Sequence, residues 1–491
     1  MTERLMRENQ LFVLRLSLSL TAEATRIVFD LSLGGEPMGR LQATPDEFGL
    51  PMTLDEANAA DRNPDCFRLP QYIAASVAAI AAHSEAKSKP LWLYIDYPSG
   101  YLPLIPWERL FQSILKIPIL RLPYLDIQPV TSRASLDVVI CMSLRGAPNE
   151  VAHEAIIEKL LSQIPSGLTS ATTLHLFANQ ASQAALRQLA ESFYSQYQII
   201  LYDPAKAPSY TEAYTQAVAS LTRDVENPWL LWIANALHGR SADVVHFLCE
   251  GYLCREKGNL SLGESPLGKV DAYWASRVDA QQLSVFLNRL GAWAVAFSSP
   301  PGNTSLGGLR LLQEQLSRLR PGPVLLHDMD QDRGSKPLAN CYRFLFASKP
   351  GRPPQSAAVA LSCHPLQLVG EKSESGDQSI LEELTMATKL SEILRGSENT
   401  PAWIAGSQRS LEQAAAALIH RTKVSEGLRG LQETLGKTLE GGDSPLEHIP
   451  TFVNESTRKA ALVHEVIRSG TENALRFTSN LLAKAVLDKE I

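Results

Sequence analysis

Residues 243–253 of the chain read DVVHFLCEGYL, and residues 294–301 read AVAFSSPP. Each stretch is a short, mostly apolar run that ends in polar residues, Glu250 in the first and Ser298 and Ser299 in the second. Runs of this kind predict strands that are buried on both faces of a parallel sheet. Functional groups in such sheets gather beyond the carboxyl ends of the strands, so Glu250 and Ser299 are the first candidates for a site.

The same kind of run recurs on both sides of these two stretches. Between residues 131 and 365, apolar and β-branched segments alternate with helical segments. This alternation predicts an α/β core with a mostly parallel sheet that helices cover on both faces. Predicted strands are 136–141, 173–177, 198–202, 244–249, 294–297 and 323–327, and predicted helices between them include 150–164 and 182–194.

The N-terminal region, residues 1–130, is predicted to be rich in strands. Its Pro106-Trp107-Glu108 triplet suits a helix start, because proline fits the first turn and a carboxylate there favours the helix dipole. We expect Trp107 to anchor that helix in the core. The other predicted elements are strands at 12–18, 26–31 and 91–96 and a helix at 73–83.

The C-terminal part of the chain has a different character. Residues 370–378 form a polar linker without apolar anchors. The pattern beyond it, over residues 379–491, is helical and predicts a small bundle or a helical arm that binds a partner. The predicted helices after the first one are 410–420, 424–439 and 455–489.

Composition limits the classes of function. Hydrophobic residues make up 45% of the chain and charged residues 20%, as in ordinary globular proteins. A net charge of −6 argues against broad nucleic-acid binding, which needs a basic surface. The sequence contains neither a signal-peptide pattern nor an apolar run of about 18 residues, so we expect no membrane span and a cytoplasmic location.

The cysteines favour reduced thiols over metal ligands. All six are scattered, and Cys249 and Cys254 lack a second pair that would complete a zinc site. His246 lies three residues before Cys249, which places the two side chains on opposite faces of a strand. We therefore expect neither a metal nor another cofactor, and the free thiols favour the cytoplasm.

Taken in order, these segments resemble the CHAT domain, a branch of the caspase-like (separase-like) peptidases. The resemblance covers roughly residues 90–350. It implies a caspase-like, mostly parallel sheet flanked by helices, with the β-rich region before it and the all-helical region 379–491 after it. The segments that carry the resemblance are 106–108, 136–141 with its following helix, 244–251, and then 306–319, 323–327 and 340–345.

The resemblance also shows what the chain lacks. In caspase-like cysteine proteases a His precedes a Gly at the first strand end, and the Cys nucleophile lies roughly 50 residues downstream. Glu250 occupies the His position here, and Ser299 occupies the Cys position, or Ser298 or Pro300 if the register slips by one. Glu250 and Ser299 are 299 − 250 = 49 residues apart. A carboxylate is not an imidazole poised near neutral pH, and a serine is a weaker nucleophile than a thiolate. The resemblance thus implies a protease fold that has lost its catalytic pair.

Residues around the two positions remain candidates for binding. A peptide can pair with the edge of a strand without any nucleophile. We expect His246 to be mainly a core histidine bonded to a neighbour and Cys249 to be a buried thiol. The candidates for lining a peptide-binding cleft are His246, Gly251, Ser298 and Pro300.

Three other features could form sites, and each also has a purely structural interpretation. His238 precedes Gly239 and is expected to lie in a polar turn before the strand at 244. His327 ends a strand and is followed by an acidic cluster that we expect to be a solvated loop. Gly302-Asn303-Thr304 is expected to be a turn into the next helix. The acidic cluster comprises Asp328, Asp330 and Asp332.

Three functions fit these observations. The first is a pseudoprotease that acts as a scaffold, regulator or adaptor for protein partners, such as an active CHAT or caspase-like protease or an effector of a bacterial defence or programmed-death pathway. The second is an active peptidase that uses Ser299 with Glu250. The third is a protein that a partner protease cuts in the linker at 370–378 to release a helical effector.

Overall fold

The computed structural model describes residues 10–369, with short internal gaps. All described residues belong to one compact unit, Met1–Lys372. The predicted linker and the predicted helical region 379–491 lie outside the described residues. The gaps are 21–23, 84–85, 87–88, 125–134, 145–149, 169–170, 194–196, 210–226, 255, 268–274, 303–305, 321, 333, 335 and 348–350.

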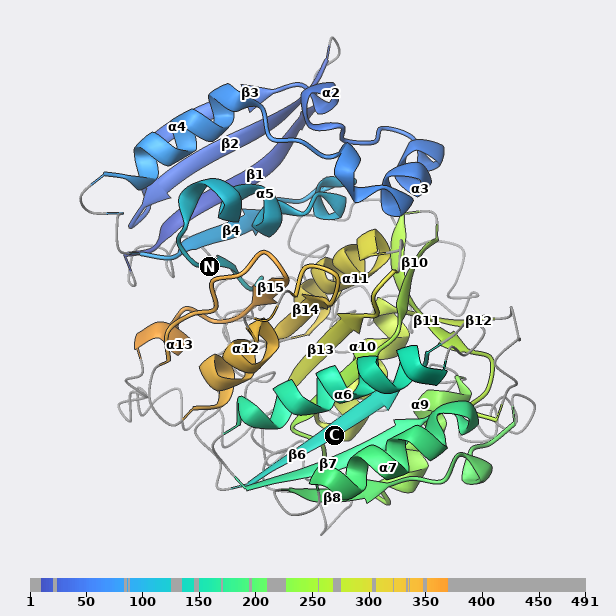
Figure 1. Ribbon diagram of the computed structural model, residues 1–491. Helices are drawn as coiled ribbons and strands as arrows, with labels where there is room; N and C mark the ends of the chain where they lie inside the picture. The colour runs from blue at the N-terminus through green and yellow to red at the C-terminus, as the bar shows by residue number, and fades with distance from the viewer. Residues whose placement is uncertain are drawn as a thin grey trace, which may run out of the picture. The chain divides into compact units, whose positions relative to one another are not determined.

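Twelve strands form one sheet through this unit (Figure 1). Most neighbouring strands are parallel, and the antiparallel neighbours among the described strands are β1–β2, β2–β3 and β14–β15. A large, mainly parallel sheet flanked by helices is therefore confirmed. In spatial order the strands are β3 (Glu36–Ala43), β2 (Thr25–Leu33), β1 (Phe12–Leu20), β4 (Leu91–Ile95), β5 (Ile119–Arg121), β15 (Val359–Ser362), β14 (Val324–Asp328), β13 (Ala294–Ser299), β9 (Val244–Leu248), β6 (Ser135–Met142), β7 (Ala171–Ala178) and β8 (Gln198–Leu201).

The chain reverses its direction of travel across the sheet at β6. It proceeds from β6 to β7 and β8 on one side, then returns to β9 on the other side and continues through β13 and β14. The carboxyl ends of β6 and β9 therefore flank the crevice at which open α/β sheets bind ligands. Glu250 comes two residues after the end of β9, so it lies at this switch point.

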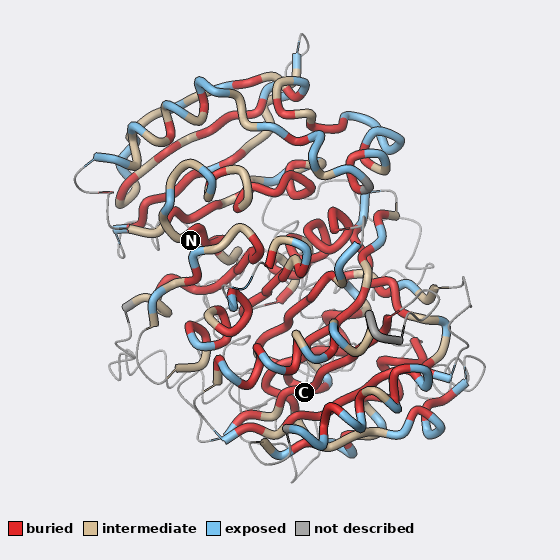
Figure 2. Tube along the Cα trace, viewed as in Figure 1, coloured by how far each residue is buried: buried red, intermediate tan, exposed pale blue. Residues whose placement is uncertain are grey.

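Helices cover both faces of the sheet, because both faces of its central strands are apolar. Along β6, Val138 and Ile140 enter one core cluster while Val139 and Cys141 enter another. Figure 2 shows the strands as buried segments between helices that are exposed on their outer sides. One face packs against α6 (Glu150–Ser166), α7 (Gln183–Phe193) and α12 (Pro337–Phe346), and the other against α9 (Pro228–Ala236), α10 (Ala280–Leu290) and α11 (Leu306–Leu319).

The first strands have their own core cluster on the second face. Trp107 is fully buried there, and its indole N–H donates to the carbonyl of Leu102 at 2.9 Å. Its predicted role as an anchor is confirmed. The helices that carry this cluster are α2 (Pro45–Phe48), α3 (Leu54–Arg62), α4 (Gln71–Ala81) and α5 (Trp107–Leu115).

The N-terminal strands join the rest of the sheet through a narrow contact. β5 pairs with β15 at one residue pair, Arg121 with Ser362, and the amide of Cys363 donates to the carbonyl of Arg121 at 3.2 Å. The β-rich region thus continues the sheet of the core. So small a backbone contact leaves most of the attachment to side chains.

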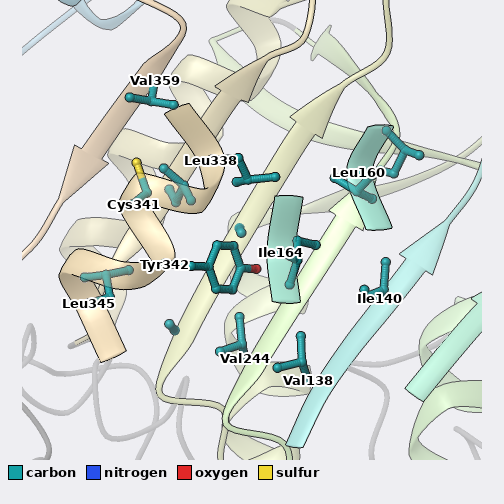
Figure 3. Packing of buried hydrophobic residues seen from close by; sticks show 14 of the residues in the cluster. Val138, Ile140, Leu160, Ile164, Val244, Leu338, Cys341, Tyr342, Leu345 and Val359 are labelled. Atoms are coloured by element: carbon teal, nitrogen blue, oxygen red, sulfur yellow. The ribbon is translucent and has the colours of Figure 1, made fainter. Parts of the chain in front are cut away.

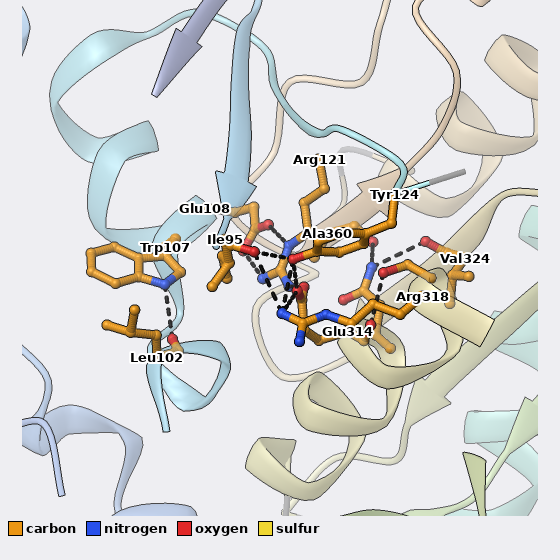
Figure 4. Close-up of polar contacts among 12 residues, drawn as sticks. Ile95, Leu102, Trp107, Glu108, Arg121, Tyr124, Glu314, Arg318, Val324 and Ala360 are labelled. Atoms are coloured by element: carbon orange, nitrogen blue, oxygen red, sulfur yellow. Dashed lines mark hydrogen bonds and ion pairs between the residues drawn. The ribbon is translucent and has the colours of Figure 1, made fainter. Parts of the chain in front are cut away.

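A buried cluster of charged residues contributes to that attachment (Figure 4). Arg121 donates to the carboxylate of Glu108 at 2.6 and 3.1 Å, and its Nη1 lies 3.6 Å from Glu314 on α11. These three side chains are at most 5% exposed. Tyr124 and Arg318 donate to the other oxygen of Glu314. Glu108 of the Pro-Trp-Glu triplet therefore binds an arginine, in addition to its place in the first turn of α5.

A second, three-stranded sheet follows β9 directly. It consists of β10 (Glu250–Cys254), β11 (Lys257–Gly263) and β12 (Ala275–Asp279), all antiparallel. α11 packs against this sheet through backbone contact, because a Cβ atom at Gly308 would lie 2.6 Å from the carbonyl carbon of Tyr252. Gly258 approaches the carbonyl of Gly308 in the same way. The two glycines thus bring the helix and the small sheet together.

Candidate functional site

The two strand ends that the sequence singles out lie side by side. β9 and β13 are parallel neighbours, with Leu248 opposite Ser298, and the amide of Cys249 donates to the carbonyl of Ser298 at 3.2 Å. Glu250 and Ser299 therefore lie at the same edge of the sheet. Ser299 is 3% exposed, and its carbonyl accepts from the amide of Met329 at 3.3 Å.

A histidine–serine pair links the same two strands, but deeper in the sheet. Nε2 of His246 in β9 lies 2.8 Å from Oγ of Ser298 in β13. Both side chains are 0% exposed, so the pair lies inside the core. The prediction that His246 is a core histidine bonded to a neighbour is confirmed. Cys249 is buried in the cluster on the opposite face of the strand, as expected.

The pair belongs to a longer chain of hydrogen bonds. Oγ of Ser298 lies 2.9 Å from Nδ1 of His327 in β14, and Nε2 of His327 lies 3.2 Å from Oδ2 of Asp332. At the other end, Nδ1 of His246 lies 2.8 Å from the hydroxyl of Tyr342 on α12. Figure 3 shows the Tyr342 ring among apolar side chains of α6, α12 and the sheet. We call these five residues the buried chain.

Donors and acceptors fix the direction of the buried chain when both imidazoles are neutral. A carboxylate only accepts, so His327 donates from Nε2 to Asp332 and its Nδ1 is left as an acceptor. The Ser298 hydroxyl then donates to His327, and its oxygen accepts from Nε2 of His246. Nδ1 of His246 accepts from the Tyr342 hydroxyl. Every donor is used once and all four bonds point toward Asp332, an arrangement in which each bond strengthens the next.

Electrostatics support this arrangement at His246 and at Asp332. Burial, with His327 nearby, lowers the pKa of His246 to about 3, so this imidazole is neutral at physiological pH. Burial alone would raise the pKa of Asp332, but hydrogen bonds from His327 and Gln163 outweigh it and lower the pKa to about 2. Gln163 donates to Asp332 at 2.6 Å, and Nζ of Lys159 lies 3.7 Å from the same oxygen. The buried chain therefore ends on a carboxylate that α6 holds.

The acidic cluster after β14 differs from its prediction. Asp330 is exposed, and its carboxylate accepts from the amide of Gly302 at 3.0 Å. Asp332 is buried at 5% exposure, so the prediction of a solvated loop is wrong for this residue. The reason is that the loop folds back, and Asp332 pairs with His327 and with two side chains of α6. His238 lies in a turn at the amino end of β9, as expected.

The residues proposed to line a cleft are mostly inaccessible. His246 and Ser298 are fully buried, Gly251 is buried, and Pro300 is half-buried. A peptide at the strand ends would thus meet Pro300, and not the buried residues His246, Ser298 and Gly251.

Accessible side chains near Glu250 come from the small sheet. Tyr252 is 38% exposed, and the guanidinium of Arg277 lies 3.9 Å from the centre of its ring. Ser261 of β11 stands opposite both Glu250 on β10 and Arg277 on β12, so these side chains share one face. We call Glu250, Tyr252 and Arg277 the β10–β12 strip. The sequence did not reveal it, because Arg277 reaches Tyr252 only through strand pairing.

The described residues contain no group of three or more His, Cys, Asp and Glu side chains arranged to hold a metal ion. No helix among them has both the length and the apolar character needed to cross a membrane. Comparison with models of protein families, with curated proteins and with solved structures gave no match.

Proposed function

We propose that the chain is a non-catalytic protein of the CHAT type, which acts through protein contacts at the carboxyl edge of its sheet. The order of the strands and helices that suggested this family, and the lack of a His and a Cys at the two expected positions, support the proposal. In this view it is a scaffold, regulator or adaptor in the cytoplasm. Its partner is a protein of a bacterial defence or programmed-death pathway, such as an active caspase-like protease.

The observation that carries the proposal is that the buried chain of hydrogen bonds uses the histidines of both strands beside β13. β13 has two neighbours, β9 and β14, and each contributes one histidine. Both imidazoles bond to Ser298 inside the core. Ser299 at the strand end thus receives no imidazole from either neighbouring strand. A serine hydroxyl without a positioned base is a poor nucleophile, so the carboxyl end of β13 favours binding over turnover.

The β10–β12 strip provides a surface for such binding. Tyrosine and arginine are enriched among the residues that dominate the energy of protein interfaces. The stacking of Arg277 on Tyr252 holds both side chains in a defined position before a partner arrives. Within the described part of the chain, β10 pairs only with β11, so its other edge can accept an extended peptide as an additional strand.

One peptide library tests the proposal in two ways. The full-length chain is incubated with the library, and cleavage is read by mass spectrometry. The same library is then passed over the immobilised chain, and the retained peptides are identified. We expect no cleavage, and we expect retention that Tyr252→Ala weakens at least tenfold, whereas Tyr97→Ala has no effect. Tyr97 is a suitable control because it is 80% exposed and lies outside the strip.

Two outcomes would overturn the proposal. Cleavage that Ser299→Ala abolishes would establish the alternative, an active peptidase with Ser299 as nucleophile. The absence of any retained peptide, or retention that is indifferent to Tyr252, would remove the β10–β12 strip as the binding surface.

A further inference from the structure

We propose that Ser298, His327 and Asp332 form a latent nucleophilic triad within the core, able to react once with small acyl or phosphoryl electrophiles. The inference goes beyond the proposed function, because it concerns the buried chain and not the β10–β12 strip. It requires no bound partner. Its failure would leave the binding proposal untouched.

The geometry matches the roles that such a triad needs. The Ser298 hydroxyl lies 2.9 Å from Nδ1 of His327, within reach for proton transfer. The second ring nitrogen of His327 lies 3.2 Å from Asp332, which orients the ring and stabilises its protonated form. Gln163 in turn fixes Asp332 at 2.6 Å. A nucleophile, a base and an orienting carboxylate are therefore present in the correct order.

The direction of the hydrogen bonds selects the base among the two histidines. The Ser298 hydroxyl donates to His327, so His327 takes its proton, while His246 donates to the serine oxygen. With diisopropyl fluorophosphate as the electrophile, a bond forms between Oγ of Ser298 and phosphorus, and the phosphorus–fluorine bond breaks. Fluoride leaves with the bonding electron pair, and the serine proton moves to Nδ1 of His327. No oxidant or reductant is needed.

Access to Ser298 limits the fraction of molecules that can react at any moment. Its side chain is 0% exposed in the closed structure, but it is only one residue from the end of β13. Strand ends open locally at a lower free energy than the whole fold. The reagent therefore reacts slowly, during such openings, and low urea below the unfolding transition accelerates the reaction. Complete unfolding stops it, because the triad is then dispersed.

The test is labelling of the full-length chain with diisopropyl fluorophosphate, followed by intact mass and peptide mapping. We expect one adduct, located on Ser298, that is absent in Ser298→Ala and in protein unfolded by urea. Ser284→Ala is the matched control: Ser284 is also 0% exposed, and its hydroxyl has no hydrogen-bond partner. Labelling in this variant should equal that of the wild type. His327→Asn should slow the labelling at least about 100-fold, the lower range of general-base catalysis.

Asp332 is a positioning residue, and its role has a separate readout. Asp332→Asn should slow labelling, while Asp332→Glu should restore part of the rate because it keeps the carboxylate. Circular dichroism of each variant shows whether it is folded. No adduct on folded wild-type protein, an adduct on Ser299, or equal rates in wild type and His327→Asn would each overturn the proposal.

Discussion

Nε2 of His246 and Oγ of Ser298 are 2.8 Å apart, and both side chains are fully buried. They come from β9 and β13, the two strands at whose ends the protease resemblance expects a histidine and a nucleophile. His246 lies four residues before Glu250, and Ser298 one residue before Ser299. The histidine–serine pair of these two strands thus belongs to the core, and the ends of the strands carry Glu250 and Ser299, to which neither histidine bonds.

The neutral state of His246 predicts a loss of stability in mild acid. Its pKa is about 3 in the fold against 6.5 for a free histidine, so the unfolded chain binds a proton in this range that the folded chain does not. Stability from this group is complete above pH 6.5 and declines as the pH falls toward 3. Between pH 7 and pH 5 the expected loss is about 2 kcal/mol.

Urea unfolding at pH 7 and pH 5 measures this loss. His246→Gln lacks the titrating ring. Between the two pH values its free energy of unfolding should therefore fall by about 2 kcal/mol less than that of the wild type. The comparison of slopes is independent of any constant destabilisation by the substitution. Equal pH dependence in the two proteins would refute the role assigned to His246.

The buried charges at the junction of β5 and β15 predict a large cost for removing one partner. Glu108→Gln leaves Arg121 buried with its remaining partner at 3.6 Å, so the free energy of unfolding should fall by about 3–5 kcal/mol. Asp65→Asn is the control, since Asp65 pairs with Arg109 but is 74% exposed. That exposed pair should be worth less than about 1 kcal/mol. Similar costs for the two substitutions would contradict the structure of the junction.

Close packing of α11 on the small sheet predicts that Gly308→Ala is destabilising. Alanine normally favours a helix over glycine, but here its Cβ would lie 2.6 Å from the backbone of Tyr252. We expect a loss of about 1–3 kcal/mol and faster amide exchange in β10 and β11. At Gly351 the nearest atom to an added Cβ is 3.4 Å away, so Gly351→Ala is the control with little effect. A stabilised Gly308→Ala would show that the helix and the small sheet are not in backbone contact.

Ser298 connects two histidines, so its removal should cost more than that of another buried serine. Ser298→Ala leaves a donor on His246 and an acceptor on His327 unpaired, with an expected loss of about 1–3 kcal/mol. Ser284→Ala removes a buried hydroxyl without a partner and should be neutral or stabilising. Equal effects of the two substitutions on the urea midpoint would show that the buried chain adds no stability.

Local sequence patterns were enough to predict the parts of the fold that depend on them. The strands of the core follow from apolar runs, and they are found as β6, β7, β9, β13 and β14. The helix at 306–319, which the family resemblance implied, is found as α11. The junction of β5 with β15 was not predictable, because Arg121 and Ser362 are distant in sequence and pair only in the folded chain. The sheet β10–β12 was not predictable either. The sequence around Glu250 is typical of the end of a strand, whereas in the fold β10 begins at that residue.

For the candidate site, the sequence located the strand ends but not the connections between side chains. The positions of Glu250 and Ser299 followed from the C-terminal ends of predicted strands. Sequence spacing does not specify which histidine meets which serine across a sheet. The bond from His327 to Asp332 was missed for a related reason: a run of aspartates after a strand is typical of a solvated loop, and only the fold shows that α6 covers it.

The most direct test of the account is the protonation of the two histidines, measured by nitrogen-15 NMR of labelled full-length protein at neutral pH. We expect His246 to be neutral and to carry its proton on Nε2, with slow exchange of that proton with water. We expect Nδ1 of His327 to carry no proton, because it accepts from the Ser298 hydroxyl in the buried chain. The coupling of each ring nitrogen to the carbon-bound hydrogens of its ring gives this assignment. A charged His246, or a proton on Nδ1 of His327, would contradict both the buried chain and the latent triad.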